Sequence, residues 1–316
     1  MLPYLLNRDA GNPSFGDVMI IGAGSGNDVQ AALSFGAKRV DGVEIEPLMS
    51  EIGRAHHPNR PYDDPRVHLH FDDGRSFVRK TGQQFDLAIY ALVDSLVLHS
   101  GYSSIRLESF LFTEQAMRDL RARLKPDGVF AMYNFYRQGW VVGRLVEIIR
   151  KVFGTEPLVI SLPYNPKIAA NDTQRSITFV IVGNRENRSV EKIRQAFAEK
   201  SSFWIAHEPR KNLDLNAFGP LPPPGFPSSD WLRIGPAQVN TEGVGRLPTD
   251  DWPFLYLREP TIPALNFRGL VIVGVLSLVI LFLFAPVRRI KPNPQMFLLG
   301  AGFMLLETKS VVHLAL

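Results

Sequence analysis

Short apolar runs alternate with amphipathic segments through the first half of the chain. The runs have the length of buried strands, and the segments between them carry apolar residues at helical spacing. The predicted strands cover residues 17–22, 39–46, 66–71, 85–91 and 129–135, and the predicted helices cover residues 27–35, 47–55, 113–124 and 140–153. Strands that alternate with helices predict an α/β fold, in which a parallel sheet carries helices on both faces.

Two further apolar runs, residues 157–162 and 176–182, follow the last of these helices. The segment between them is too short for a long crossover helix, and a parallel pair needs such a crossover. We therefore expect these two strands to pair antiparallel, which gives the sheet a reversed strand at its edge.

The pattern changes after residue 183. Residues 219–227, GPLPPPGFP, are rich in Pro and Gly and should be irregular or extended. Residues 248–260, PTDDWPFLYLREP, combine aromatic and acidic side chains. We interpret residues 184–262 as an appendage that packs partly on the sheet, and residues 1–16 as a short lead-in.

The C-terminal part has the pattern of a membrane protein. Residues 269–287 contain no charge over 19 positions, and such a helix is about 28 Å long, close to the thickness of a bilayer core. A second apolar run, residues 296–316, carries Glu307, Lys309 and His313. We expect residues 263–316 to be a transmembrane region, and the chain to be a piece of a larger multi-pass membrane protein.

Composition removes several classes of function. The chain has no cysteine, which excludes disulfides, Cys-ligated zinc and thiol nucleophiles. Its net charge of +4 is spread along the sequence, with no Lys/Arg stripe of a nucleic-acid binder. His56 and His57 are adjacent and lack metal-ligand spacing, so we predict no metal site and no nucleic-acid partner. The N-terminus lacks the basic region of a signal peptide.

Residues 20–33, IIGAGSGNDVQAAL, hold the strongest chemical signal. Gly22, Gly24 and Gly26 follow a predicted strand and open a helix, where glycines permit a tight turn and close approach of a ligand. Glu44 ends the next strand, where a carboxylate can accept hydrogen bonds from both ribose hydroxyls. A dinucleotide fingerprint needs a third glycine where this chain has Asn27.

The glycine pattern resembles motif I of class I S-adenosylmethionine (SAM)-dependent transferases. In that superfamily an acid after the third strand hydrogen-bonds the adenine amino group, and Asp73 in HFDDG is the matching residue. LKPDG (124–128) is similar to the turn before the fifth strand of those enzymes. Taken singly, Glu44 and Asp73 could be solvated loop acids, but their order after successive strands favours an adenosyl ligand.

The resemblance narrows to the spermidine synthase, or polyamine aminopropyltransferase, branch of the superfamily. Four segments resemble this branch, namely VEIEPLM (43–49), DDPRVHLHFDDGRSF (63–77), FDLAIYALVDS (85–95) and FLFTEQAMRDLRARLKPDG (110–128). The resemblance covers about residues 17–183 and implies a Rossmann-like class I methyltransferase sheet. It implies SAM or decarboxylated SAM as co-substrate, contacted by Gly22, Gly24, Gly26, Glu44 and Asp73.

The tail resembles large bacterial membrane proteins that embed a spermidine synthase-like domain. TDDWPFLYL (249–257) and GAGFMLLETKSVVHLAL (300–316) carry this likeness. Arg288, Arg289 and Lys291 follow the span and weigh against a cytosolic domain before it. We nevertheless expect the domain in the cytosol, where adenosyl donors are supplied, with membrane lipid around the helices.

The acceptor side departs from the resembled pattern. The family carries two acids in D-S-x-D-P, and here the first position is Ala91 and the second Asp94. An acid there can hold a cationic amine and help remove its proton. Asp94 is thus the candidate catalytic residue, as a cation-binding acid or as the base of a changed reaction, although Asp also commonly caps turns. The candidate substrate residues nearby are Tyr90, Tyr102, Ser103 and Glu108.

Three functions follow from these patterns. The first is a membrane-tethered transferase that alkylates a small-molecule acceptor, such as an amine or polyamine. The second is a SAM-dependent methyltransferase. The third is a non-catalytic nucleoside-binding module of a membrane transporter or channel, which Ala91 and the ionisable residues of the second apolar run favour.

Overall fold

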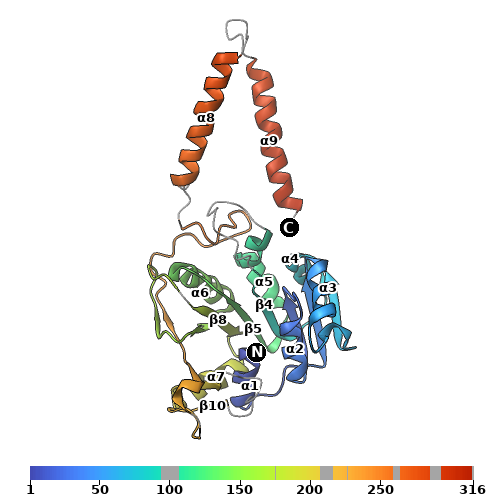
Figure 1. Cartoon of the computed structure of the whole chain (residues 1–316), viewed down its shortest axis with the longest axis vertical. Helices are drawn as coiled ribbons and strands as arrows, with labels where there is room; N and C mark the ends of the chain where they lie inside the picture. The colour runs from blue at the N-terminus through green and yellow to red at the C-terminus, as the bar shows by residue number, and fades with distance from the viewer. Residues whose placement is uncertain are drawn as a thin grey trace.

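The computed structural model describes residues 1–93, 107–174, 176–206, 216–225, 227–258, 264–284 and 293–314. Within these ranges a globular body carries two long helices that rise away from one of its ends (Figure 1).

A seven-stranded sheet with the order β3-β2-β1-β4-β5-β8-β6 forms the centre of the body. Its strands are β1 (Asp17–Ile21), β2 (Arg39–Glu44), β3 (Val67–Phe71), β4 (Phe85–Ala91), β5 (Leu124–Asn134), β6 (Leu158–Leu162) and β8 (Ile177–Gly183). The strands from β1 to β5 pair parallel. The expected antiparallel pairing of the last two strands is confirmed, because β8 runs antiparallel to β6 and also to β5. The reversed strand β8 lies next to the edge of the sheet, which β6 forms. The fold is that of a class I methyltransferase-like domain.

Helices cover both faces of the sheet, as the alternating pattern predicted. On one face lie α4 (Gly74–Lys80), α5 (Glu114–Ala122) and α6 (Gly139–Phe153); on the other lie α1 (Leu2–Asp9), α2 (Asn27–Ser34) and α7 (Arg188–Lys200). Alternate residues of β1 serve the two layers: Met19 and Ile21 pack in the first core, and Val18 and Ile20 in the second. Helix α3 (Pro47–His56) leaves much of its apolar surface exposed.

The lead-in is part of the body. Leu5 and Leu6 of α1 are fully buried, and the ring of Tyr4 stacks on Phe35 at 5.3 Å between centroids. The short apolar patch at the N-terminus is therefore core sequence.

The part after residue 183 contributes α7 to one sheet face and then forms small sheets. A three-stranded sheet has the order β10-β9-β11, with β9 (Phe203–Ala206), β10 (Ala217–Phe218) and β11 (Trp231–Ile234). Strand β12 (Gln238–Val239) pairs with β7 (Lys167–Ile168). The described ranges also contain the 3₁₀ turns η1 (Pro61–Asp63), η2 (Leu107–Phe112) and η4 (Ser228–Asp230).

Residues 244–258, which we call the strap, are held on the body by one buried arginine. The Arg144 guanidinium donates to the carbonyl oxygens of Val244, Phe254, Leu255, Leu257 and Arg258, at donor–acceptor distances of 2.7–3.0 Å. The guanidinium also lies over the ring of Trp140, 4.8 Å from its centroid. Burial lowers the pKa of Arg144 to about 10, and the five carbonyls supply the solvation that the buried cation needs.

A second contact fixes the middle of the strap. The Asp250 carboxylate accepts a hydrogen bond from the Thr113 hydroxyl at 2.5 Å and pairs with Arg75 at 3.3 Å. Thr113 caps α5, and Arg75 lies in the first turn of α4. The aromatic-acidic stretch is thus a docking sequence that joins α4, α5 and α6.

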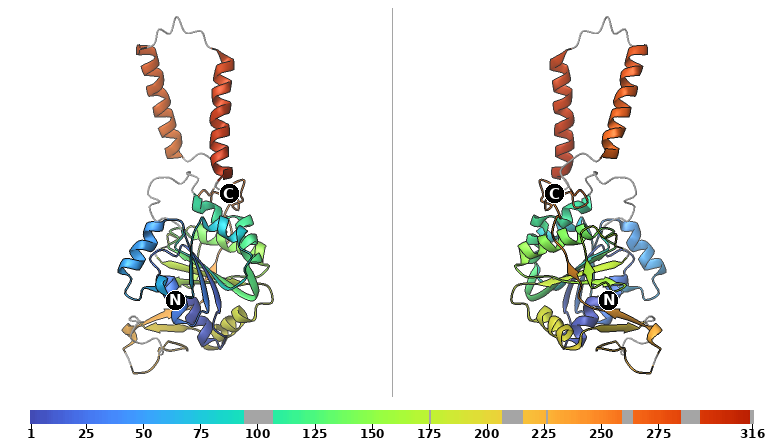
Figure 2. Two further views of the ribbon diagram at one scale, coloured as in Figure 1. Left: turned by 90° about the vertical axis from the view of Figure 1, so that its right-hand side faces the viewer. Right: turned by 90° about the vertical axis from the view of Figure 1, so that its left-hand side faces the viewer.

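Helices α8 (Ala264–Phe284) and α9 (Pro294–Leu314) extend from the body (Figures 1 and 2). Residues 267–284 have a mean hydropathy of 2.6 and are not buried in the structure. Among the described residues, one helix, α8, is long and apolar enough to cross a membrane. The apolar stretch of α9, Pro294–Glu307, is shorter. The two spans expected around 269–287 and 296–316 stay predictions.

Candidate functional site

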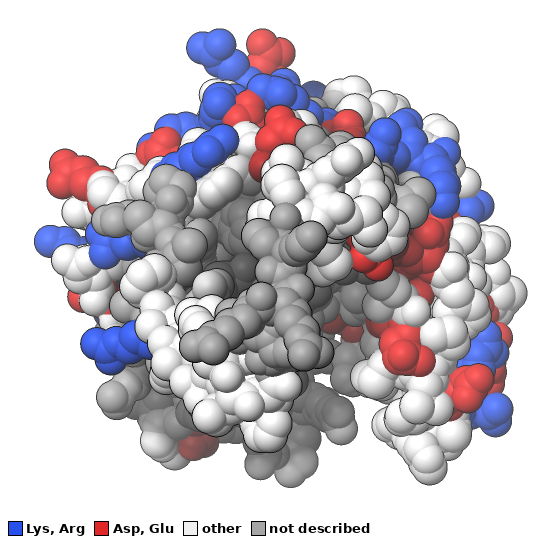
Figure 3. Space-filling view, turned by 90° about the horizontal axis from the view of Figure 1, so that it is seen from above, with Lys and Arg blue, Asp and Glu red and all other residues white. Residues whose placement is uncertain are grey.

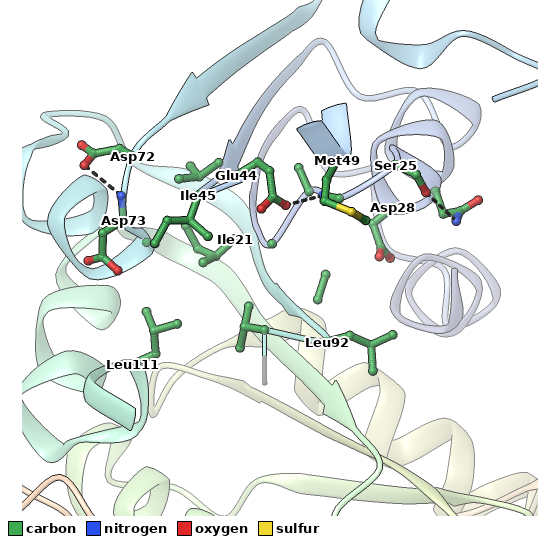
Figure 4. A pocket seen from close by; sticks show the side chains of 18 of the residues that line it. Ile21, Ser25, Asp28, Glu44, Ile45, Met49, Asp72, Asp73, Leu92 and Leu111 are labelled. Atoms are coloured by element: carbon green, nitrogen blue, oxygen red, sulfur yellow. Dashed lines mark hydrogen bonds between the residues drawn. The ribbon is translucent and has the colours of Figure 1, made fainter. Parts of the chain in front are cut away.

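A cavity of about 440 Å³ opens at the carboxyl ends of β1, β2 and β4, where α/β sheets bind their ligands. It is lined by Ile21, Gly22, Ala23, Gly24, Ser25, Asn27, Asp28, Val43, Glu44, Ile45, Met49, Asp72, Asp73, Gly74, Ala91, Leu92, Val93, Leu111 and Tyr133 (Figure 4). Gly22, Gly24, Glu44 and Asp73, all predicted to contact a donor, meet here. Gly26 lies just behind the lining.

The glycine turn fits tightly between neighbouring strands. Gly22 has a φ of +79°, and a Cβ there would lie 2.8 Å from the Ala91 carbonyl oxygen. The backbone N–H groups of Gly22 and Ala23 both donate to the Val43 carbonyl, at 2.9 and 3.0 Å. Only glycine permits this approach without strain, so the turn is held against the ends of β2 and β4.

The outer side of the turn is supported by η1. Gly26 has a φ of +97°, and a Cβ there would lie 2.6 Å from the Pro61 ring. The Tyr62 hydroxyl donates to the Gly24 carbonyl at 2.7 Å. Gly26 therefore shapes the turn through its packing.

Glu44 is anchored by the backbone on both sides. Its Oε2 accepts from the Gly24 N–H at 2.7 Å, and its Oε1 accepts from the Glu46 N–H at 3.0 Å. The residue is only 8% exposed. A carboxylate oxygen can accept more than one hydrogen bond, so the anchored group keeps capacity for two ligand hydroxyls. This is the geometry expected of a ribose acceptor.

Asp73 caps a helix and also lines the cavity. Its Oδ1 accepts from the Ser76 N–H at 2.9 Å and so caps α4. The same residue lines the cavity. Burial raises the pKa of its carboxyl above the ordinary value, against the opposing hydrogen bonds from the helix. Asp73 is thus a fixed acid at the cavity wall.

Asp28 and Tyr133 line the cavity and were missed as site residues. The Tyr133 hydroxyl donates to the Asp28 carboxylate, and the Tyr133 ring stacks on Phe179 at 5.1 Å. Burial, with Asp28 beside it, raises the pKa of Tyr133. Asp28 stands within the quoted glycine motif, so the sequence held a signal for it. Tyr133 comes from β5, and its contact with α2 needs the fold.

The described lining of the cavity carries only acidic charged side chains. Four acids line it, namely Asp28, Glu44, Asp72 and Asp73, and among its described lining residues there is no Lys, Arg or His. Asp72 is partly neutralised by Lys80, which lies 3.3 Å from it. Such a cavity favours a cationic ligand over an anionic one.

Apolar side chains form one side of the cavity. Ile45, Met49 and Leu92 line it while remaining 57%, 40% and 49% exposed. Leu92 has a φ of +49°, uncommon for a residue with a side chain. Outliers of this kind gather at functional sites.

The acceptor side is only partly described. Ala91, at the family's first acidic position, lines the cavity. Tyr90 is 1% exposed, and its ring packs against Phe112 and Phe130 in the core, while its neighbours line the cavity. Asp94, Tyr102 and Ser103 lie outside the described residues, as does the Glu108 side chain. Their roles stay predictions.

His56 ends α3 and His57 caps it, and His56 is exposed. In the ranges that the structure describes, no group of three His, Asp or Glu side chains is placed to hold a metal ion.

Comparison with known proteins shows which branch of the methyltransferase-like fold this chain is similar to. Residues 10–164 match the family model of the spermine/spermidine synthase domain, a stretch that contains the whole lining of the cavity. This part of the chain, just under half of its length, is therefore similar to the spermine/spermidine synthase domain.

Similar proteins include the polyamine aminopropyltransferase of Clostridium perfringens, 33% identical over 123 residues that make up 38% of this chain and 40% of the relative. That of Leptospira biflexa is 32% identical over 147 residues, 45% of this chain and 49% of the relative. The chain thus spans about two fifths to one half of the length of these curated relatives.

Among solved structures, a spermidine synthase in complex with the transition-state analogue AdoDATO is 21% identical with a TM-score of 0.43, covering 63% of this chain and 61% of that one. The spermidine synthase of Thermotoga maritima is 22% identical with a TM-score of 0.44, covering 60% and 59%.

Proposed function

We propose that the chain is a transferase that takes an adenosyl sulfonium donor and alkylates an amine. The observation that carries this proposal is Glu44, anchored by the Gly24 and Glu46 amides at the wall of the cavity. With Asp73 fixed on the same wall, the cavity offers one acceptor for a ribose and one for an adenine amino group. The match to the spermine/spermidine synthase domain supports the same donor class.

The charge of the cavity favours decarboxylated SAM over SAM. SAM carries a carboxylate at the end of its arm, and four acids with no basic residue among the described lining would oppose it. Decarboxylated SAM ends in an ammonium, which the same acids attract. We therefore place aminopropyl transfer before methyl transfer.

The reaction needs a neutral amine beside the donor. The amine nitrogen attacks the carbon attached to the sulfonium, the carbon–sulfur bond breaks, and its electron pair stays on sulfur to give a thioether. The nitrogen then loses one proton. In this proposal Asp94 holds the cationic amine or takes that proton, and Tyr102, Ser103 and Glu108 belong to the acceptor side.

Ala91 favours a second candidate, a nucleoside-binding module without catalysis. Its side chain lines the cavity at the position where the resembled enzymes carry an acid. Binding of the adenosyl group depends on Glu44 and Asp73 and does not need that acid. A module of this kind binds donor and product without turnover.

We propose further that the intact protein is a multi-pass membrane protein with its catalytic domain in the cytosol. The support is the span of residues 267–284, with its mean hydropathy of 2.6 and its exposed surface. Protease protection in sealed vesicles tests the side on which the domain lies.

Calorimetric titration of the full chain with decarboxylated SAM, SAM and methylthioadenosine tests the donor. We expect decarboxylated SAM to bind most tightly, and Glu44→Gln to weaken its binding about tenfold to a hundredfold. Glu51→Gln is the matched control, because Glu51 is an exposed glutamate on α3 outside the cavity lining. Absence of binding by all three ligands contradicts the proposal.

Turnover separates the transferase from the module. Incubation with decarboxylated SAM and putrescine should release methylthioadenosine, and Asp94→Asn should lower the rate. Tight binding with no turnover for any amine supports the module instead.

A further inference from the structure

We infer that the acceptor is an amine carried by a membrane lipid, whose headgroup reaches the cavity while its acyl chains stay in the bilayer. This inference rests on the proposed function and specifies its acceptor. The structure contributes three observations, which concern the strap, the two long helices and the apolar side of the cavity.

The strap connects the cavity wall to the start of α8. Asp73 lines the cavity and caps α4, and Arg75 in the first turn of that helix pairs with Asp250 of the strap. The strap then runs to Arg258, whose carbonyl accepts from Arg144, and α8 begins at Ala264. The strap therefore contacts the helix that Asp73 caps, and its last residue precedes the start of the most apolar helix by six positions.

The two long helices rise from this end of the body. Figure 1 shows the lower end of α9 near α4, and α8 starting above the strap. Figure 3 shows the molecule from the same end, with Lys, Arg, Asp and Glu side chains mostly towards the rim of the described surface. A bilayer around residues 267–284 would thus face the part of the body that holds the cavity.

Exposed apolar side chains continue from the cavity onto the surface. Ile45, Met49 and Leu92 line it, and Leu48 on α3 and Phe71 at the end of β3 are each 56% exposed. Contact with water by several large apolar side chains at one place is unfavourable and marks an interaction site. Because α8 and α9 lie at this end, the partner that fits these side chains is a lipid surface.

The chemistry of the cavity then selects the lipid. Four acids inside the cavity attract a cationic headgroup, and the apolar residues beside them suit acyl chains. A lipid with a primary amine, such as phosphatidylethanolamine, has both parts. Its nitrogen, once neutral, attacks the aminopropyl carbon of the donor; the carbon–sulfur bond breaks towards sulfur, and the nitrogen releases one proton.

The test uses the full chain reconstituted in vesicles with decarboxylated SAM labelled in its aminopropyl group. One set of vesicles contains phosphatidylcholine alone, and the other contains added phosphatidylethanolamine. We expect label in the lipid fraction of the second set only. Donor binding with no labelled lipid, by a preparation that labels putrescine in a parallel assay, overturns this inference and leaves the proposed function standing. No donor binding in either set overturns the proposed function itself.

A pair of variants tests the apolar contact. Leu48→Asp places a charge on α3 outside the cavity lining, and we expect lipid labelling to fall roughly fivefold while donor affinity, measured in parallel, stays within about twofold. Leu221→Asp is the control, because Leu221 is 75% exposed and follows β10 at the opposite end of the body. Equal labelling by the two variants contradicts a lipid contact at α3.

Discussion

The hydroxyl of Tyr133 donates a hydrogen bond to the carboxylate of Asp28 at one end of the donor cavity. Glu44 lies between Asp28 and Asp73 (Figure 4), in keeping with the strand order β3-β2-β1. If Asp73 receives the adenine and Glu44 the ribose, the arm of the donor extends towards Asp28. This order of acids predicts that Asp28 affects only ligands that have a charged arm.

Asp28→Asn should weaken the binding of decarboxylated SAM about tenfold to a hundredfold and leave methylthioadenosine nearly unaffected. The reason is that methylthioadenosine has the same adenosyl group but no ammonium on its arm. Calorimetric titration of both ligands measures the difference, and Tyr133→Phe, which keeps the acid, serves as control with a smaller effect. An equal loss for the two ligands would show that Asp28 shapes the turn and does not meet the arm.

Gly22→Ala should lower both thermal stability and donor affinity. The added Cβ would lie 2.8 Å from the Ala91 carbonyl, and the residue has a φ of +79°, which alone costs a side chain about 1–2 kcal/mol. Gly82→Ala is the matched control, because no atom lies within 4 Å of a Cβ at that position. Thermal unfolding and methylthioadenosine titration are the measurements, and similar behaviour of the two variants would refute the tight approach of β1 to β4.

Arg144→Met should destabilise the body by about 3 kcal/mol or more, because five strap carbonyls lose their donor inside the protein. Arg150→Met on the same helix removes exposed ion pairs with Glu147 and Glu156, and such pairs contribute about 1 kcal/mol or less. Denaturant unfolding compares the two variants. Proteolysis should also cut the strap faster in Arg144→Met, and unchanged cleavage speaks against the anchoring role.

Asp41 gives the fold a defined sensitivity to acid. It is 1% exposed, and although burial opposes ionisation, hydrogen bonds from Arg39 and His70 keep the pKa of its carboxyl below the ordinary 3.8. A lowered folded-state pKa gives stability that is present above the unfolded pKa and is lost as pH falls through the folded one. The difference in melting temperature between wild type and Asp41→Asn should therefore shrink from about pH 5 to about pH 3. A difference in melting temperature that stays constant over this pH range would contradict the stabilising role of the ionised Asp41 carboxylate.

Much of the site was predictable because it lies at the ends of apolar strands. Gly22, Glu44 and Asp73 each lie at or just after the end of a strand that the apolar pattern reveals, and parallel strands bring their carboxyl ends to one edge. The sequence could not separate capping from binding at Asp73, because one oxygen caps α4 while the residue lines the cavity. It also could not pair Tyr133 with Asp28, which are 105 residues apart.

The part after residue 183 was less predictable for a different reason. Helix α7 packs under the sheet beside α1 through Ile193 and Phe197, within the region expected to pack partly on the sheet. The strap has no regular periodicity, because its contacts with Arg144 are made by backbone carbonyls. Every residue has a carbonyl group, so no sequence pattern identifies a segment whose carbonyl groups accept hydrogen bonds from a side chain.

The Arg144 anchor also sets an order of events during synthesis. Its carbonyl partners lie 100 to 114 residues further along the chain, and α8 begins at Ala264, six residues after the last of them. The body reaches its final form only when residue 258 has left the ribosome, at a moment when the apolar helix is already following. Maturation of the domain and delivery of α8 to its surroundings are therefore coupled steps of biogenesis.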